Sequence, residues 1–324
     1  NDAKTLNDNL GKLNQAISDA NSAKSTPNYT EADSGKQKAL ADALSEAENA
    51  KNSNDPSAVA TATNDLQAAQ SGLNGDSNLA NTKKQADQNI GQMTNLSDDQ
   101  KKAAKDKITS ANTSSDVTKA ENDAKTLNDN LGKLNQAISA ANSAKSTPNY
   151  KEADSGQQTA LDDALSEAEK AKNSNDPSAV ATATNHLQDA QSGLNGDSNL
   201  ANTKNQADQK IEQMTNLSAA QKKAAKDKIK SANTSSDVTK AENDAQTLND
   251  NLGNLNQAIS EANSAKSTPN YTEADSGKQT ALDDALSAAE NAKNSNDPSA
   301  VATATKHLQD AQSGLNGDSN LANT

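Results

Sequence analysis

The apolar residues between positions 116 and 145 recur at alternating intervals of three and four. This spacing places them on one face of a helix, and it is the heptad pattern of helices that pack side by side. It predicts one helix from about Asp116 to Lys145, on the order of 45 Å long at 1.5 Å per residue. The stripe consists of Val117, Ala120, Ala124, Leu127, Leu131, Leu134, Ile138 and Ala141.

Three shorter stripes of the same kind occupy the first 75 residues, and helix start and stop signals separate them. We therefore expect a three-helix module, whose first helix ends near Lys24. The signals are the break at Ser25–Tyr29, a capping box at Ser34 and Gln37, the N-cap pair Asp55 and Pro56, and a stop at Gly72.

A second, shorter three-helix module follows and has no stop signal at its end. Its last helix therefore continues as the long helix, where Gly132 costs about 1 kcal/mol relative to Ala and permits a bend. The predicted signals are an N-cap at Asp76 or Ser77, a turn at Thr94–Leu96, a capping box at Ser97 and Gln100, and an N-cap at Ser115.

The whole arrangement repeats with a period of 121 residues, since the motif that begins at Asn1 returns at Asn122 and, slightly altered, at Asn243. Thr324 corresponds to Thr82, so both chain ends fall inside predicted helices. We expect a segment of a longer array, with any signal peptide or wall anchor outside it. The predicted modules are 1–75, 76–121, 122–196, 197–242, 243–317 and a truncated 318–324.

Large apolar residues are scarce: Leu, Ile and Val make up 38 of 324 residues, there is no Phe, and the net charge is -13. A share this far below roughly 20% is typical of disordered chains, so a disordered stalk is one alternative. Because the few large residues form narrow stripes with alanine between them, we instead predict an all-α fold. It consists of tandem three-helix bundles joined by shared long helices into an elongated rod, in which neighbours stabilise one another.

Composition also narrows the chemistry. The absence of cysteine excludes disulfides and thiol catalysis, and no apolar run approaches the ~18 residues of a membrane span. The 31 basic residues are all lysines interspersed with 44 acids, which argues against nucleic-acid binding. With no catalytic, cofactor-binding or metal-binding constellation in the sequence, we expect no enzyme activity.

Individual polar motifs have structural explanations. His186 and His307 stand where the first copy has Asp65, so a solvated helix position is the expected role. Asn52–Asp55 and Gly75–Asn78 lack the loop length and terminal Glu of a calcium site and are interpreted as helix caps. Lys101–Lys107 is interpreted as a solvated helix face because acids are interspersed.

The three tyrosines are the only aromatic residues, one in each larger module beside a proline. One interpretation is a loop aromatic folded over the end of the bundle. The other is a repeated contact residue for a partner, because tyrosine is enriched at interfaces. The candidate partner-binding residues are Tyr29, Tyr150 and Tyr271.

Two stretches resemble known modules. LNQAIS, NYTEAD, ALADALSEAENA and DPSAVATATNDLQAAQSGL resemble a FIVAR module, and MTNLS followed by QKKAAKDKI resembles a GA-type module. Their alternation is similar to giant staphylococcal extracellular-matrix-binding surface proteins of the Ebh and Embp type. The resemblance covers the chain and implies a monomeric, cell-wall-associated rod of a Gram-positive bacterium, with affinity for matrix proteins such as fibronectin.

Other functions remain open beside this adhesive one. A pure structural spacer without a ligand has the same sequence features. An albumin-binding array is a further alternative suggested by the GA resemblance. We do not expect albumin binding, because the helix that begins Asp98–Asp99, or Ala219–Ala220 in the second copy, carries no aromatic anchor.

Overall fold

The computed structural model describes residues 2–323, so the predicted terminal positions Asn1 and Thr324 lie outside the described residues. Every regular element in this range is a helix, which confirms the all-α prediction. The chain divides into two compact units. The first runs to Ala141 and includes Asp162–Asp189, and the second contains Asn142–Leu161 and the chain from Ala190 onwards.

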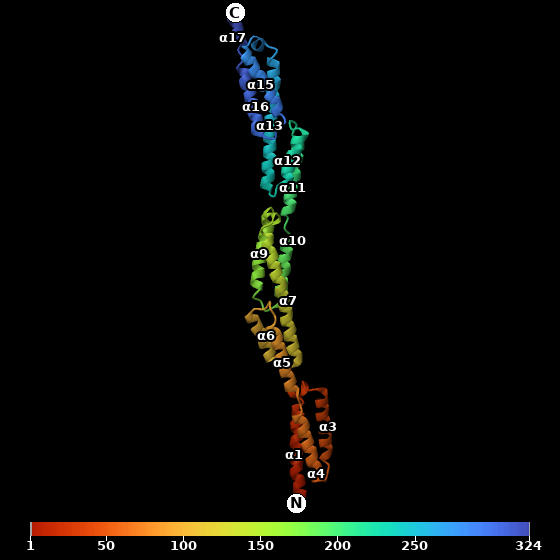
Figure 1. Ribbon diagram of the computed structural model, residues 1–324. Helices are drawn as coiled ribbons and strands as arrows, with labels where there is room; N and C mark the ends of the chain where they lie inside the picture. Colours follow the sequence, from red (N-terminus) through yellow and green to blue (C-terminus); the bar gives the residue numbers. More distant parts are fainter. Residues whose placement is uncertain (1, 324) are drawn as a thin grey trace. The chain divides into compact units, whose positions relative to one another are not determined.

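The helices recur in the same order in each copy (Figure 1). The first copy contains α1 (Asp2–Ala23), α2 (Pro27–Thr30), α3 (Ser34–Ala50), α4 (Pro56–Ser71), α5 (Gly75–Gly91) and α6 (Asp98–Ser110). The helix α7 (Ser114–Ala144) runs from the first copy into the second, which also contains α8 (Pro148–Lys151), α9 (Ser155–Ala171), α10 (Pro177–Ser192), α11 (Gly196–Glu212) and α12 (Ala219–Ser231). Likewise, α13 (Ser235–Ala265) runs from the second copy into the third, which also contains α14 (Pro269–Thr272), α15 (Ser276–Ala292), α16 (Pro298–Ser313) and α17 (Gly317–Ala322).

In the first unit, α1, α3 and α4 pack against one another as a three-helix bundle (Figure 1). Leu13, Leu40 and Leu66, one from each helix, are fully buried in its core. The three apolar stripes predicted in the first 75 residues therefore form the core of this bundle, although Leu6 and Leu10 near the start of α1 are only partly buried.

In the second unit, α11, α12 and α13 form one bundle, and α13, α15 and α16 form the next. A single core cluster extends through both, from Leu200 to Leu315. Val238 and Ala262, at opposite ends of α13, both belong to it. One helix therefore supplies the core of two successive bundles, which confirms the shared-helix prediction.

The long helix predicted from Asp116 to Lys145 is α7, whose 31 residues run from Ser114 to Ala144. All eight residues of its predicted stripe are buried. No helix among the residues that the structure describes has the length and apolarity needed to cross a membrane.

Two of the predicted helix starts are confirmed in detail. Asp55 Oδ1 accepts a hydrogen bond from the Ser57 amide at 2.8 Å and caps α4. Ser97 and Gln100 form the predicted capping box at the start of α6, since each side chain accepts from the other's backbone amide.

Three other predicted caps are wrong. The N-cap of α3 is Asp33 and not Ser34, and Gln37 donates to the Tyr29 carbonyl instead of closing a capping box. Residues Asp76 and Ser77 lie inside α5, which begins at Gly75. The cap of α7 is Thr113 and not Ser115, because the Thr113 hydroxyl accepts from the Asp116 amide at 3.1 Å.

Candidate functional site

The predicted tyrosine sites lie on the short helices α2, α8 and α14, which each begin with a proline at the end of a bundle. All three tyrosines are half-buried. Tyr29 and Tyr271 pack against the cores of their own modules. These two rings are therefore folded over their bundles, and a role of the three tyrosines in binding a partner stays a prediction.

The copies differ in what surrounds the ring. The Tyr271 hydroxyl donates to Asp283 at 2.9 Å, and the Lys266 ammonium lies 2.8 Å from the other carboxylate oxygen of Asp283. Lys266, followed by Tyr271, lowers the pKa of Asp283, whereas the hydrogen bond to Asp283 raises the pKa of the Tyr271 hydroxyl. The first copy has Ala41 in place of Asp283, so Tyr29 has no carboxylate at this position.

The loop that carries each tyrosine also joins its module to the next one. In the first copy, Asn28 Oδ1 accepts from the Asp76 amide at 3.1 Å. Asp33 accepts from the side-chain amides of Asn74 at 2.8 Å and Asn78 at 3.0 Å, and these two bonds lower the pKa of Asp33. We call the loop Pro27–Asp33 and its copies the junction loop.

One contact of the junction loop reaches much further along the chain. Glu31 Oε2 accepts from the amide of Ser114, the first residue of α7, at 3.0 Å. In the second unit, Glu152 makes the same contact with Ser235, the first residue of α13, at 3.1 Å. The residues of this junction were missed as functional candidates because each is a common loop or cap residue type.

A second kind of junction joins the shorter module to the larger module that follows. The side chain of Gln100 is 3% exposed, and its Nε2 donates to the carbonyls of Lys172 at 3.0 Å and Ser174 at 2.7 Å. Gln221 makes the equivalent bonds to Lys293 and Ser295. One side chain thus caps its own helix and holds the neighbouring bundle.

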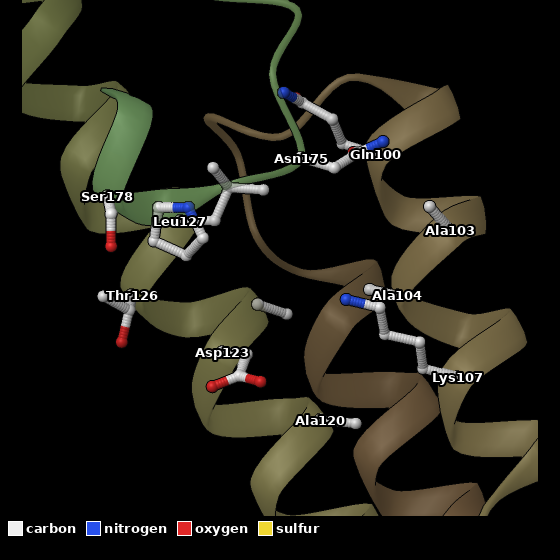
Figure 2. A pocket seen from close by; sticks show the side chains of 12 residues that line it. Gln100, Ala103, Ala104, Lys107, Ala120, Asp123, Thr126, Leu127, Asn175 and Ser178 are labelled. Atoms are coloured by element: carbon white, nitrogen blue, oxygen red, sulfur yellow. The ribbon is translucent and has the colours of Figure 1, made fainter. Parts of the chain in front are cut away.

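A groove lies beside this second junction (Figure 2). Its volume is about 320 Å³, and Ala103, Ala104 and Lys107 of α6 face Asp123 of α7 across it. A groove with the equivalent lining, from Gln221 to Ser299, occurs in the second unit. The walls are mostly small and polar, without an aromatic side chain, so the groove lacks the lining usual for a small-molecule site.

Among the other polar motifs, Gly75–Asn78 is not a cap, because it forms the first turn of α5, whose N-cap is Asn74. The Asn52–Asp55 motif and His186 have the predicted structural roles. The Asp55 amide donates to the Ser53 hydroxyl at 3.1 Å within the Asn52–Asp55 segment, which continues into the α4 cap. His186 is half exposed and lies 3.5 Å from Glu167. Among residues 2–323 there is no group of three or more acidic or histidine side chains placed to hold a metal ion.

The lysine-rich face of α6 is matched by acids, as expected for a solvated face. Lys102 pairs with Asp106 at 2.7 Å, and Lys105 pairs with Asp87 at 3.0 Å. In the second copy Lys226 pairs with Glu212, which replaces Gly91, and one oxygen of Asp208 is left without a partner. Lys102, Lys105 and Lys226 therefore form local ion pairs.

These features define a helical tandem-repeat protein whose bundles are joined by shared helices and by recurring polar junctions. The GA-module pattern matches residues 76–130 and 197–251, and the FIVAR-domain pattern matches residues 10–74, 130–195 and 251–316. The chain belongs to the family of proteins built from alternating FIVAR and GA modules.

Extracellular matrix-binding proteins of Staphylococcus aureus are similar to this chain over nearly its whole length. Extracellular matrix-binding protein ebh of Staphylococcus aureus strain MRSA252 is 35% identical over 99% of this chain, and EbhB of strain Newman is also 35% identical over 99%. The chain spans 3% and 5% of the lengths of these two relatives.

A solved structure confirms the relation at the level of the fold. The crystal structure of the 756–1003 domain of EbhA from Staphylococcus aureus has a TM-score of 0.68 and 29% identity, covering 73% of this chain and 98% of that chain. The matched proteins are matrix-binding repeat proteins and not members of enzyme families.

Proposed function

We propose that this chain is a repeat segment of a bacterial cell-wall-associated adhesin. It acts as a stiff stalk that makes weak, multivalent contacts with a host extracellular matrix protein. The observation that carries the proposal is the match of 99% of the chain to extracellular matrix-binding surface proteins of Staphylococcus. Fibronectin is the first matrix protein to test, because the family resemblance implies it.

The stalk role is supported by how modules are joined. A helix such as α7 leaves no flexible linker between one bundle and the next, and hydrogen bonds from Gln100 and from the junction loop add contacts across each boundary. We propose the module boundaries 1–75, 76–121, 122–196, 197–242, 243–317 and 318–324 and a monomeric, elongated rod. Small-angle X-ray scattering tests the rod: a compact particle or a Gaussian chain contradicts it.

Adhesion would arise from repetition. Contacts too weak to hold singly add up on an immobilised ligand when several modules engage together. We place these contacts at Tyr29, Tyr150 and Tyr271, one in each FIVAR-type module. Chains with one, two and three copies of the 121-residue unit are to be assayed on immobilised fibronectin, with a triple Tyr→Ala chain as control. Binding should rise more than proportionally with copy number and fall in the control.

A pure spacer is the second candidate, and one observation favours it. Among the described residues, Leu321 is the only large apolar side chain that is exposed, so the apolar anchors that dominate tight interfaces are absent. The same observation speaks against albumin binding. Equal, background-level retention of all three chains on fibronectin would favour the spacer.

A further inference from the structure

The junction loop lies where the apolar core is interrupted. The core cluster of the first bundle includes Leu73 of the connection after α4, but among the described residues it contains none from α5. In the second unit the core cluster that includes the GA-type module begins at Leu200, inside that module. The FIVAR-to-GA boundary is therefore held by polar contacts and close backbone packing, unlike the continuous core along α13.

The backbone packing at this boundary is tight. A Cβ atom added to Gly75, the first residue of α5, would lie 2.5 Å from the carbonyl oxygens of Pro27 and Asn28. Asn28 also accepts from the amide of Asp76. The junction loop thus packs against one side of the start of α5.

The same loop also contacts the start of α7. The first four amides of a helix have no intrahelical acceptor, and a carboxylate there gains both a hydrogen bond and a favourable interaction with the helix dipole. Thr113 accepts from Asp116 and so satisfies one such amide. Glu31, which lies 83 residues away in the preceding module, satisfies the amide of Ser114.

We propose that the junction loop is a docking platform for the GA-type module that follows it. Through the Ser114 amide, Glu31 makes the stability of the long shared helix depend on the preceding FIVAR-type module. The coupling is reciprocal, because one bond links an acceptor of the upstream module to a donor of the downstream helix. Glu152 and Ser235 repeat it for α13.

Hydrogen exchange of the full chain tests this coupling. In the Glu31→Ala chain, amides of residues 114–121 should exchange about tenfold faster, which is the effect of losing a hydrogen bond to a charged group. Residues 235–242 should exchange at the original rate, because Glu152 is intact. Peptides that begin at Thr109 or Lys230 distinguish the two copies by mass.

Glu46→Ala provides the matched control, since it removes the same charge from an exposed position of α3. It should leave residues 114–121 unchanged. Faster exchange that also spreads into α5 and α6 supports the proposal, because these helices belong to the docked module. An unchanged rate at residues 114–121, or an acceleration confined to α3 and α4, overturns it.

A double-mutant cycle at the second junction isolates the bond itself. Proline is tolerated at the first position of a helix, and Thr234 before Ser235 already has the extended backbone that a following proline requires, with φ -137° and ψ 155°. Glu152→Ala should accelerate exchange of residues 236–242 about tenfold in the original chain and less than twofold in the Ser235→Pro chain. Equal acceleration in both backgrounds would show that Glu152 does not act through the Ser235 amide.

Discussion

The side-chain amide of Asn95 packs onto the backbone of Gly132 in the middle of α7, so that an added Cβ would lie 2.9 Å from Asn95 Nδ2. From there the amide donates to the Asn128 carbonyl at 3.0 Å. Asn216 and Gly253 repeat the arrangement on α13. The glycine that the sequence suggests as a bend is a contact point between a turn and the shared helix.

Alanine at Gly132 and at Gly11 should therefore have different effects. Gly11 is the equivalent residue of α1, and a Cβ there meets no atom within 4 Å. Gly11→Ala should raise the local unfolding free energy of its helix by about 0.5–1 kcal/mol through helix propensity. Gly132→Ala should stabilise its helix less than this, or destabilise it, because the Asn95 amide must move away.

Local free energies from native-state hydrogen exchange along α1 and α7 measure this difference. Gly253→Ala should behave like Gly132→Ala. Equal stabilisation at positions 11 and 132 would show that the Asn95 contact has no energetic consequence.

A methyl group at Gly75 should destabilise the FIVAR-to-GA junction. The added Cβ would clash with two backbone carbonyl oxygens of the junction loop, which cannot move as a flexible side chain can. Overpacking of this kind typically costs about 1–3 kcal/mol. Gly91→Ala, at the far end of α5 with nothing within 4 Å, is the control and should be neutral or stabilising. Faster exchange at the start of α5 in Gly75→Ala alone is the expected result.

Gln100→Ala should lower the free energy of unfolding by more than the loss of its helix cap alone would. The substitution removes half of the capping box and leaves the Lys172 and Ser174 carbonyls without this donor. We expect a loss of about 2 kcal/mol in the free energy of unfolding, compared with about 1 kcal/mol for Ser97→Ala, which removes a cap hydroxyl only. Exchange at the start of α10 separates the two, because it should respond to Gln100→Ala and not to Ser97→Ala.

Acid should weaken the FIVAR-to-GA junction through Asp33. The side-chain amides of Asn74 and Asn78 hold its pKa below the ordinary value of 3.8. Its contribution to stability is therefore complete above that value and is lost as the pH falls below 3.8 and passes through the lowered pKa. The NMR signals of the two asparagine side-chain amides should follow this titration with a midpoint below 3.8. A midpoint at or above 3.8 would contradict the predicted role of these bonds.

Features that depend on nearby residues were predicted well from the sequence. The apolar stripe of α7 follows from periodicity alone, and the caps by Asp55 and Ser97 involve partners two or three residues away. The capping box at Ser34 failed because Gln37 had a competing acceptor, the Tyr29 carbonyl, which the fold of the loop brings within 2.8 Å. The sequence leaves open whether the tyrosines pack over the bundle ends or contact a partner, and nothing in it pointed to the junction beside them.

The sequence by itself determined the helices, their buried faces and the continuous helix that joins two modules, because periodicity and capping act over a few residues. Only the tertiary structure decided how successive modules are held. Glu31 meets Ser114 across 83 residues, and Gln100 meets Ser174 across 74. Glutamate, asparagine and glutamine suit solvent, caps and junctions equally well, so their partners are set by the packing of the helices and not by the local pattern.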